Sequence, residues 1–270
     1  MLDAKIEIDK EQLIQQFAHD VEETARGATI QYGEGEIPPL AYMAESAADI
    51  YGRDLWINAC KKYTDHLGML KVVESALQEK GNELTFDEAL NILSELNSVL
   101  EKEGIRIFTA KAGASGRAKL VTKDSNRIEI DNALPANKGA TLIPSTTPEV
   151  GSIKGKKIAV VKRDSNLKSN IIINEDMIRG QPYFAIAAAL HEGGHVDEMK
   201  NGPEFTCRVG SDRAAKRVPI TERQSTLAVL KFARDEFTRT QNPALVKIAA
   251  PHAAIYNQVV FGTNLLQKKV

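Results

Sequence analysis

The sequence contains few cysteines, few aromatic residues and no long apolar run. Its only two cysteines, Cys60 and Cys207, lie far apart and lack the spacing of metal ligands, so we expect reduced thiols in a reducing compartment. No apolar run approaches the ~20 residues that cross a bilayer. The first seven residues lack the apolar region of a cleavable secretory signal. We therefore expect a cytoplasmic protein that has no membrane span, although export without a cleavable signal stays open.

The small net charge of −1 conceals two halves of opposite charge. Residues 1–104 contain 9 Lys+Arg and 21 Asp+Glu, a balance of −12, and residues 105–270 contain 26 and 15, a balance of +11. Such halves could dock on each other, or the basic half could bind an acidic partner such as nucleic acid. We favour docking, because no basic cluster interleaved with aromatic residues is present.

The first hundred residues predict a series of helices. One apolar stripe recurs at helical spacing and consists of Leu13, Ile14, Phe17 and Val21. Further helices are expected over residues 40–50, 53–65 and 69–80. Thr85 and Glu88 fit a capping box, because the Thr hydroxyl can accept from the Glu88 amide while the Glu88 carboxylate reaches back. The helix that they open is expected to end near Gly104.

After residue 104 the pattern changes to short strands followed by helices. Strands are predicted over 105–109, 119–122, 127–130, 157–161 and 170–173, with a hairpin turn at 123–126. Residues 134–155 are rich in Pro, Gly, Ser and Thr and are expected to form a functional loop. We expect an α+β protein with an acidic helical domain at 1–104, for substrate recognition or regulation, and a second domain at 105–270.

A pattern typical of metal chemistry occurs at His191-Glu192-Gly193-Gly194-His195. On a helix, residues four apart lie one above the other, so His191 and His195 could bind one ion. Glu192 would project beside the open coordination position, where it could take a proton from water. Gly193 and Gly194 together cost about 2 kcal/mol of helix propensity relative to Ala. That cost predicts that a substrate, ligand or neighbouring backbone approaches the helix closely here.

A zinc site with two histidines needs a third protein ligand, which leaves the fourth position for water. The acidic candidates downstream are Glu198, Glu204, Asp212, Glu222 and Glu236. Glu222 is favoured over Asp212, because it opens the next long helix, which could return antiparallel against the first. The simpler alternative is a pair of ordinary helix histidines beside a solvated Glu192. The remaining His19 and His66 are expected to be surface or locally hydrogen-bonded residues.

Residues 170–230 resemble the core of the ImmA/IrrE family of zinc peptidases, which cleave regulatory repressor proteins. The resemblance comprises Ile171-Ile172-Ile173-Asn174, Gln181-Pro182-Tyr183-Phe184, the histidine motif, and Glu222-Arg223-Gln224-Ser225 with Ala228. Ser225 stands where the family usually has Ala, and Gly193 where it has a larger apolar residue. The resemblance implies a zincin-like domain with a small sheet and an active-site helix. It also implies Zn²⁺ held by His191, His195 and Glu222, with Glu192 as the base.

These observations predict a zinc-dependent endopeptidase that cleaves a protein substrate, whether a regulatory or a host protein. Tyr183, Tyr256 and His252 are candidates for a donor that stabilises the transition state, although no spacing supports any of them. An extended substrate could pair with an edge strand of the sheet, and residues 157–162 or 170–173 could border that cleft. The alternatives are a catalytically silent zincin-like binding or sensor protein, and a nucleic-acid-binding protein that uses its basic half. The oligomeric state is not indicated.

Overall fold

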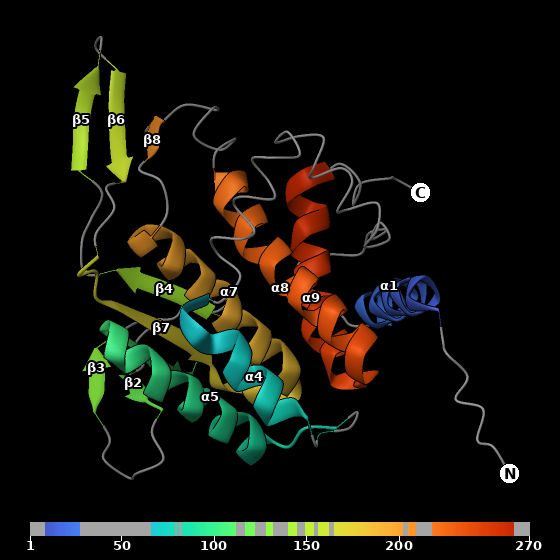
Figure 1. Ribbon diagram of the computed structural model, residues 1–270. Helices are drawn as coiled ribbons and strands as arrows, with labels where there is room; N and C mark the ends of the chain where they lie inside the picture. Colours follow the sequence, from blue (N-terminus) through green and yellow to red (C-terminus); the bar gives the residue numbers. More distant parts are fainter. Residues whose placement is uncertain are drawn as a thin grey trace, which may run out of the picture.

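The protein has a mixed α+β fold (Figure 1). This computed structural model describes residues 9–27, 66–78, 80, 83–111, 117–121, 128–131, 140–144, 149–153, 156–161, 165–201, 205–208 and 218–261. The helices are α1 (Lys10–Gly27), α4 (Met69–Leu77), α5 (Phe86–Leu100), α6 (Glu175–Gly180), α7 (Pro182–Asn201), α8 (Val218–Thr240) and α9 (Pro243–Phe261), with short 3₁₀ turns η1 (His66–Gly68) and η2 (Glu101–Glu103). The helices predicted over 40–50 and 53–65 lie outside these ranges.

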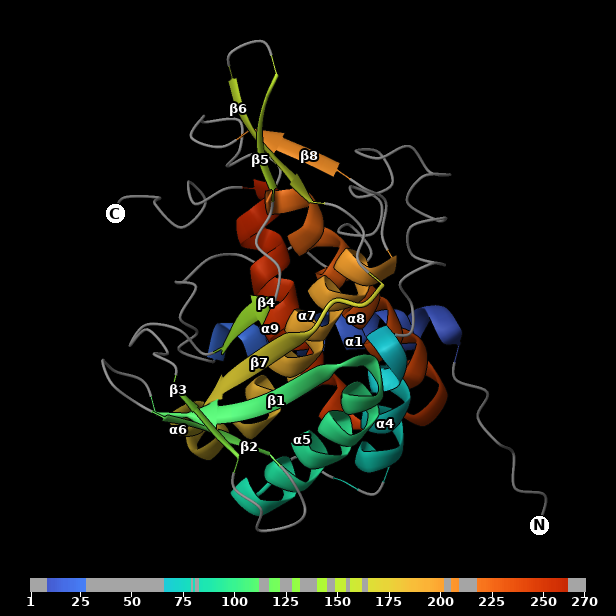
Figure 2. The same ribbon diagram turned by 90° about the vertical axis from the view of Figure 1, so that its left-hand side faces the viewer.

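The larger sheet has five strands in the order β3-β2-β1-β7-β4 (Figure 2). These strands are β1 (Ile105–Ala110), β2 (Arg117–Leu120), β3 (Glu129–Asp131), β4 (Ala140–Pro144) and β7 (Ser169–Asn174). Only β1 and β7 are parallel, and the other neighbours pair antiparallel. The predicted hairpin between β2 and β3 is confirmed. A smaller sheet, in the order β5-β6-β8, contains β5 (Glu149–Ile153), β6 (Lys156–Val161) and β8 (Phe205–Arg208).

One prediction about this region is wrong. Residues 134–155 are not a continuous loop, because β4 pairs with β7 and β5 pairs with β6. The strands considered as a border of the substrate cleft are both central in their sheets, since β7 lies between β1 and β4, and β6 lies between β5 and β8. The main-chain groups on both sides of these strands are already engaged. The edges of the larger sheet are β3 and β4.

The parallel strands β1 and β7 are the buried centre of the fold. Ile105, Ile107, Ile171 and Ile173 face a cluster that also contains residues of α4, α5 and α7. Phe108 and Ile172 point to the opposite face, where they pack with Ala110 and Ala118. Alternate residues of a strand point to opposite faces, so a strand covered on both sides reads as a continuous apolar run. One buried cluster therefore extends across residue 104, where the sequence predicts a domain boundary.

The predicted capping box is present at the start of α5. The amide of Glu88 donates to Oγ1 of Thr85 over 3.3 Å, and the amide of Thr85 donates to Oε2 of Glu88 over 2.9 Å. The helix passes into η2, and Gly104 ends it with a φ of 76°, a left-handed conformation that glycine adopts without strain. This end leads directly into β1, so α5 is held against the sheet that it covers.

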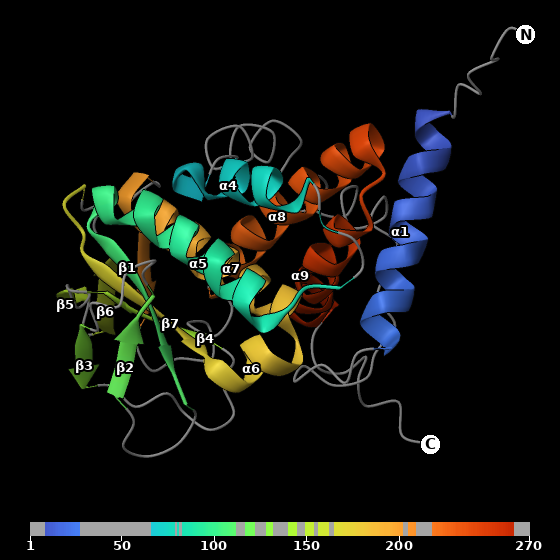
Figure 3. The same cartoon turned by 90° about the horizontal axis from the view of Figure 1, so that it is seen from below.

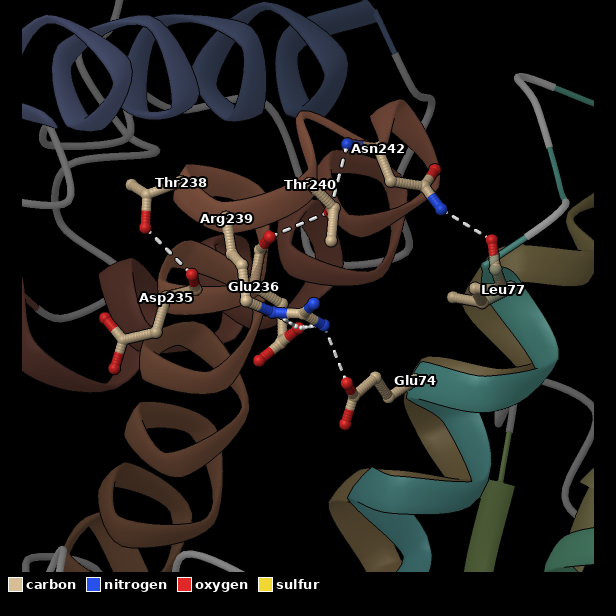
Figure 4. A network of polar contacts seen from close by, with 8 residues as sticks. All are labelled: Glu74, Leu77, Asp235, Glu236, Thr238, Arg239, Thr240 and Asn242. Atoms are coloured by element: carbon tan, nitrogen blue, oxygen red, sulfur yellow. Dashed lines mark hydrogen bonds and ion pairs between the residues drawn. The ribbon is translucent and has the colours of Figure 1, made fainter. Parts of the chain in front are cut away.

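Helix α1 packs on the side of the molecule formed by α8 and α9 (Figure 3). Leu13, Phe17 and Val21 of the predicted stripe are buried there. The far end of α8 is joined to α4 by polar contacts (Figure 4): Arg239 bridges Glu236 and Glu74, and Asn242 donates to the carbonyl oxygen of Leu77. Among the residues described, no helix is both long enough and apolar enough to cross a membrane.

Candidate metal centre

The two histidines of the motif converge on one point beside α7. Their Nε2 atoms are 3.1 Å apart, and their rings meet edge to face with centroids separated by 4.6 Å. This arrangement follows from the four-residue spacing, which places the second ring one turn above the first. His191 is buried, with 8% of its surface exposed, and His195 is half-buried. Glu192 is also half-buried.

The separation of the Nε2 atoms fits a shared zinc ion. At the usual Zn–N distance of about 2.05 Å, two nitrogens 3.1 Å apart subtend about 98° at the metal, near the tetrahedral value. The same separation also fits a hydrogen bond from a protonated Nε2 to a bare one. In both cases the two nitrogens point at each other rather than into solvent.

The two glycines of the motif lie where side chains of other elements press against α7. A Cβ on Gly193 would be 2.2 Å from Sδ of Met69. A Cβ on Gly194 would be 2.2 Å from Oγ of Ser225 and 2.7 Å from Nε2 of His66. Close approach therefore accounts for the glycines. Among the described residues, the groups that approach are side chains from α4, α8 and η1, rather than the expected substrate, ligand or neighbouring backbone.

Ser225 fixes α8 against the histidine-bearing helix. Its hydroxyl is buried and donates to the carbonyl oxygen of His191 over 2.8 Å. Figure 1 shows that α7 ends and α8 begins on the side of the molecule where β8 lies, so the two helices run in opposite directions. The antiparallel return that the sequence predicts is confirmed. Glu222 stands on α8 one turn before Ser225, and its side chain lies outside the part that the structure describes.

Of the other acidic candidates, Glu236 has a described side chain, and it lies away from this point. Glu236 lies 11 residues after Ser225, about 16 Å further along the axis of α8, where it pairs with Arg239. Glu204, Asp212 and the side chain of Glu198 fall outside the described residues. Among the side chains that are described, no group of three His, Cys, Asp or Glu residues could hold a metal ion.

His66 is a buried neighbour of the site, so its prediction as a surface residue is wrong. It is fully buried and lies against Gly194. His66 and Leu67 have φ angles of 42° and 57°, and Gly68 follows with 85°. A left-handed conformation costs energy for non-glycine residues, so tertiary packing must maintain this turn. No local pattern could have shown that residue 66 meets residue 194. His19, in contrast, is exposed on α1.

His252 lies behind His191 in the interior. Only 1% of its surface is exposed, and its ring centroid is 5.9 Å from that of His191. Its Nδ1 is 3.0 Å from the carbonyl oxygen of Ile248. Burial lowers the pKa of His252 to about 3, with a further contribution from the neighbouring His191. The ring is therefore neutral, and its depth argues against a direct role in stabilising a transition state.

The two tyrosines considered for that role give no support. Tyr183 precedes His191 by eight residues, about 12 Å along the axis of α7, and it is buried in the main core. Burial raises the pKa of its hydroxyl to about 12, and the charge of Glu88 adds to the effect. The side chain of Tyr256 lies outside the described residues, although its backbone belongs to α9.

Comparison with family models, with curated proteins and with solved structures gives no match for this chain. The candidate site therefore depends on its own geometry.

Proposed function

We propose that the chain is a zinc-dependent peptidase with a zincin-like domain, in which His191, His195 and Glu222 hold the metal and Glu192 acts as the base. The observation that carries the proposal is the 3.1 Å separation of the two Nε2 atoms on a helix with Glu192 beside them. Gly193 and Gly194 between them let side chains of α4, α8 and η1 pack closely against the segment that carries the histidines.

The position of α8 supports Glu222 as the third ligand. The bond from Ser225 to the carbonyl of His191 sets the register between the two antiparallel helices. Glu222 is three residues earlier, on the same side of α8 and about 4.5 Å along its axis toward its start. In an antiparallel pair, that shift is in the direction of His195. A carboxylate there would complete a two-histidine, one-glutamate ligand set and leave one position open.

The chemistry follows from the groups at the site. Bound zinc would supply a Lewis acid that lets water ionise near neutral pH. Glu192 would accept the proton from the attacking water and then pass it to the leaving amine. The half-buried environment of Glu192 is partly shielded from solvent, which strengthens its electrostatic interactions.

The larger sheet offers a place for an extended protein substrate. Strand β4 is an edge strand, contacts α7, and pairs with β7 through one side only among the described residues. An unpaired strand edge can bind a peptide through main-chain hydrogen bonds. A substrate bound there would lie beside the helix that carries the histidines. We therefore propose a protein or peptide substrate, such as a regulatory protein, rather than a small molecule.

A cleavage assay with a matched variant distinguishes an enzyme from a silent binding protein. Zinc-loaded wild type, Glu192→Gln and the exposed-histidine control His19→Ala would be incubated with a mixed peptide library, and new amino termini identified by mass spectrometry. We expect cleavage by the wild type and the control, and none by Glu192→Gln, although that variant retains its zinc. A wild type that binds one zinc and cleaves no peptide would favour the binding or sensor function instead.

A further inference from the structure

His252 is a buried imidazole next to His191 that no step of the proposed reaction uses. It lies in α9, directly after Pro251, whereas the two motif histidines lie in α7. The rings of His252 and His191 are tilted by 54°, with a centroid separation of 5.9 Å. A polar ring this deep requires hydrogen bonds that compensate for its removal from water.

The hydrogen bond to Ile248 determines the tautomer of His252. A carbonyl oxygen can only accept, so the Nδ1 that lies 3.0 Å from it must carry the hydrogen. A neutral imidazole has a single ring hydrogen, so this tautomer leaves a lone pair on Nε2. This Nε2 atom is buried and has no hydrogen-bond partner among the residues that the structure describes. A buried acceptor without a partner in the described part of the chain therefore belongs to a ring that neighbours His191.

His191 has a corresponding need when it binds a metal. Its Nε2 faces His195, so Nε2 is the atom that would coordinate the ion. A neutral imidazole that coordinates through Nε2 carries its hydrogen on Nδ1, which almost always donates to a second group that fixes the ring. Such partners raise the affinity for the metal because they prevent the ligand from rotating away.

We propose that His252 is the positioning residue of His191: Nε2 of His252 accepts the Nδ1 hydrogen of His191 and holds the opposite edge of that ring toward the metal. The proposal depends on the proposed function in that it requires His191 to be a zinc ligand. A linear hydrogen bond between two imidazoles needs a centroid separation of about 5.2 Å. The present separation of 5.9 Å is longer, so the two rings must approach and align when the bond forms. Contacts of this kind commonly tighten when a site is loaded.

The test compares two substitutions of His252 and a control. His252→Gln keeps an acceptor near the position of Nε2, whereas His252→Leu has a similar volume and no acceptor. His19→Gln alters an exposed histidine on α1. The zinc dissociation constant would be measured by competition with a chelator. We expect His252→Leu to weaken zinc binding by about 10- to 100-fold, and His252→Gln to recover most of the loss. The His19→Gln control should equal the wild type.

Nitrogen-15 NMR of the wild type supplies a second readout that needs neither activity nor a variant. Without zinc, His252 should carry its hydrogen on Nδ1. With zinc, a coupling across the hydrogen bond should join Nδ1 of His191 to Nε2 of His252. A hydrogen on Nε2 of His252, absence of that coupling, or unchanged zinc affinity in His252→Leu would each overturn the proposal while leaving the zinc site intact. A wild type that binds no zinc would overturn the proposed function as well.

Discussion

Replacing Gly194 with alanine tests how tightly α8 and η1 press against the histidine-bearing helix. The added Cβ would lie 2.2 Å from Oγ and 2.9 Å from Cβ of Ser225, and 2.7 Å from Nε2 of His66. All three atoms belong to buried side chains. Ser225 cannot simply rotate away without losing its hydrogen bond to the carbonyl of His191. The clash therefore falls on the contact that sets the register of the two helices.

The magnitude follows from three opposing effects. Overpacking of a well-packed site costs about 1–3 kcal/mol, and loss of the Ser225 hydrogen bond costs about 1 kcal/mol. Alanine recovers about 1 kcal/mol of helix propensity relative to glycine. We expect Gly194→Ala to lower the free energy of unfolding by about 1–3 kcal/mol. In the Ser225→Ala background the cost should be smaller, because Oγ, the nearest atom, is gone.

Urea unfolding followed by circular dichroism would measure these values alongside two matched glycine variants. In Gly193→Ala the new Cβ meets Sδ of Met69, the far part of a flexible side chain, so we expect a smaller loss. In Gly180→Ala, at the end of α6, nothing lies within 4 Å and we expect little change. Equal stability of Gly194→Ala and wild type, or a larger loss in Gly193→Ala, would refute the described packing.

Four further predictions concern the helices around the site. Thr85→Ala should lower the free energy of unfolding by about 1 kcal/mol, because it removes the cap of α5. The pKa of Glu88 is lowered from 4.5 to about 2, and the largest cause is the hydrogen bond from Lys80. The ionised carboxylate of Glu88 therefore contributes fully to stability above pH 4.5, and this contribution is lost as the pH falls toward 2. Urea unfolding across this window should show that the free energy of unfolding falls more steeply with decreasing pH in wild type than in Glu88→Gln. Asn242→Ala removes both the donor to α4 and the acceptor for the amide of Ala244 and should cost about 1–2 kcal/mol, with Asn242→Asp intermediate because it keeps the acceptor. Arg239→Ala should change the same unfolding free energy by less than about 1 kcal/mol, since its ion pairs are exposed, and a larger loss would contradict that assignment.

Local patterns predict much of this fold. The stripe of α1, the capping box of α5 and the apolar runs of β1 and β7 all depend on neighbours within a few residues. Strands β4 and β5 cannot be predicted from such neighbours, because their segment is rich in turn-forming residues. They become strands because β7 and β6 offer unpaired edges. Tertiary pairing outweighs the local preference in such segments.

The candidate site, too, can be predicted from the sequence only in part. The spacing of His191 and His195 implies that their rings meet, and the paired glycines by themselves indicate close packing against the helix. His66 and His252 reach the site from distant parts of the chain, and nothing near either residue shows where it packs. In the sequence, Ser225 is only a small polar residue three positions after Glu222. Its contact with His191 becomes apparent once the two helices are placed together.

The zinc content of the purified protein is the most direct test of the central claim. Elemental analysis would be carried out on wild type, His191→Ala, His195→Ala, Glu222→Gln and the exposed-histidine control His19→Ala, each after incubation with zinc and removal of the excess. We expect one zinc per chain in the wild type and the control, and much less in the three ligand variants. One zinc per chain retained in both His191→Ala and His195→Ala, or none in the wild type, would contradict the claim that these histidines bind the metal.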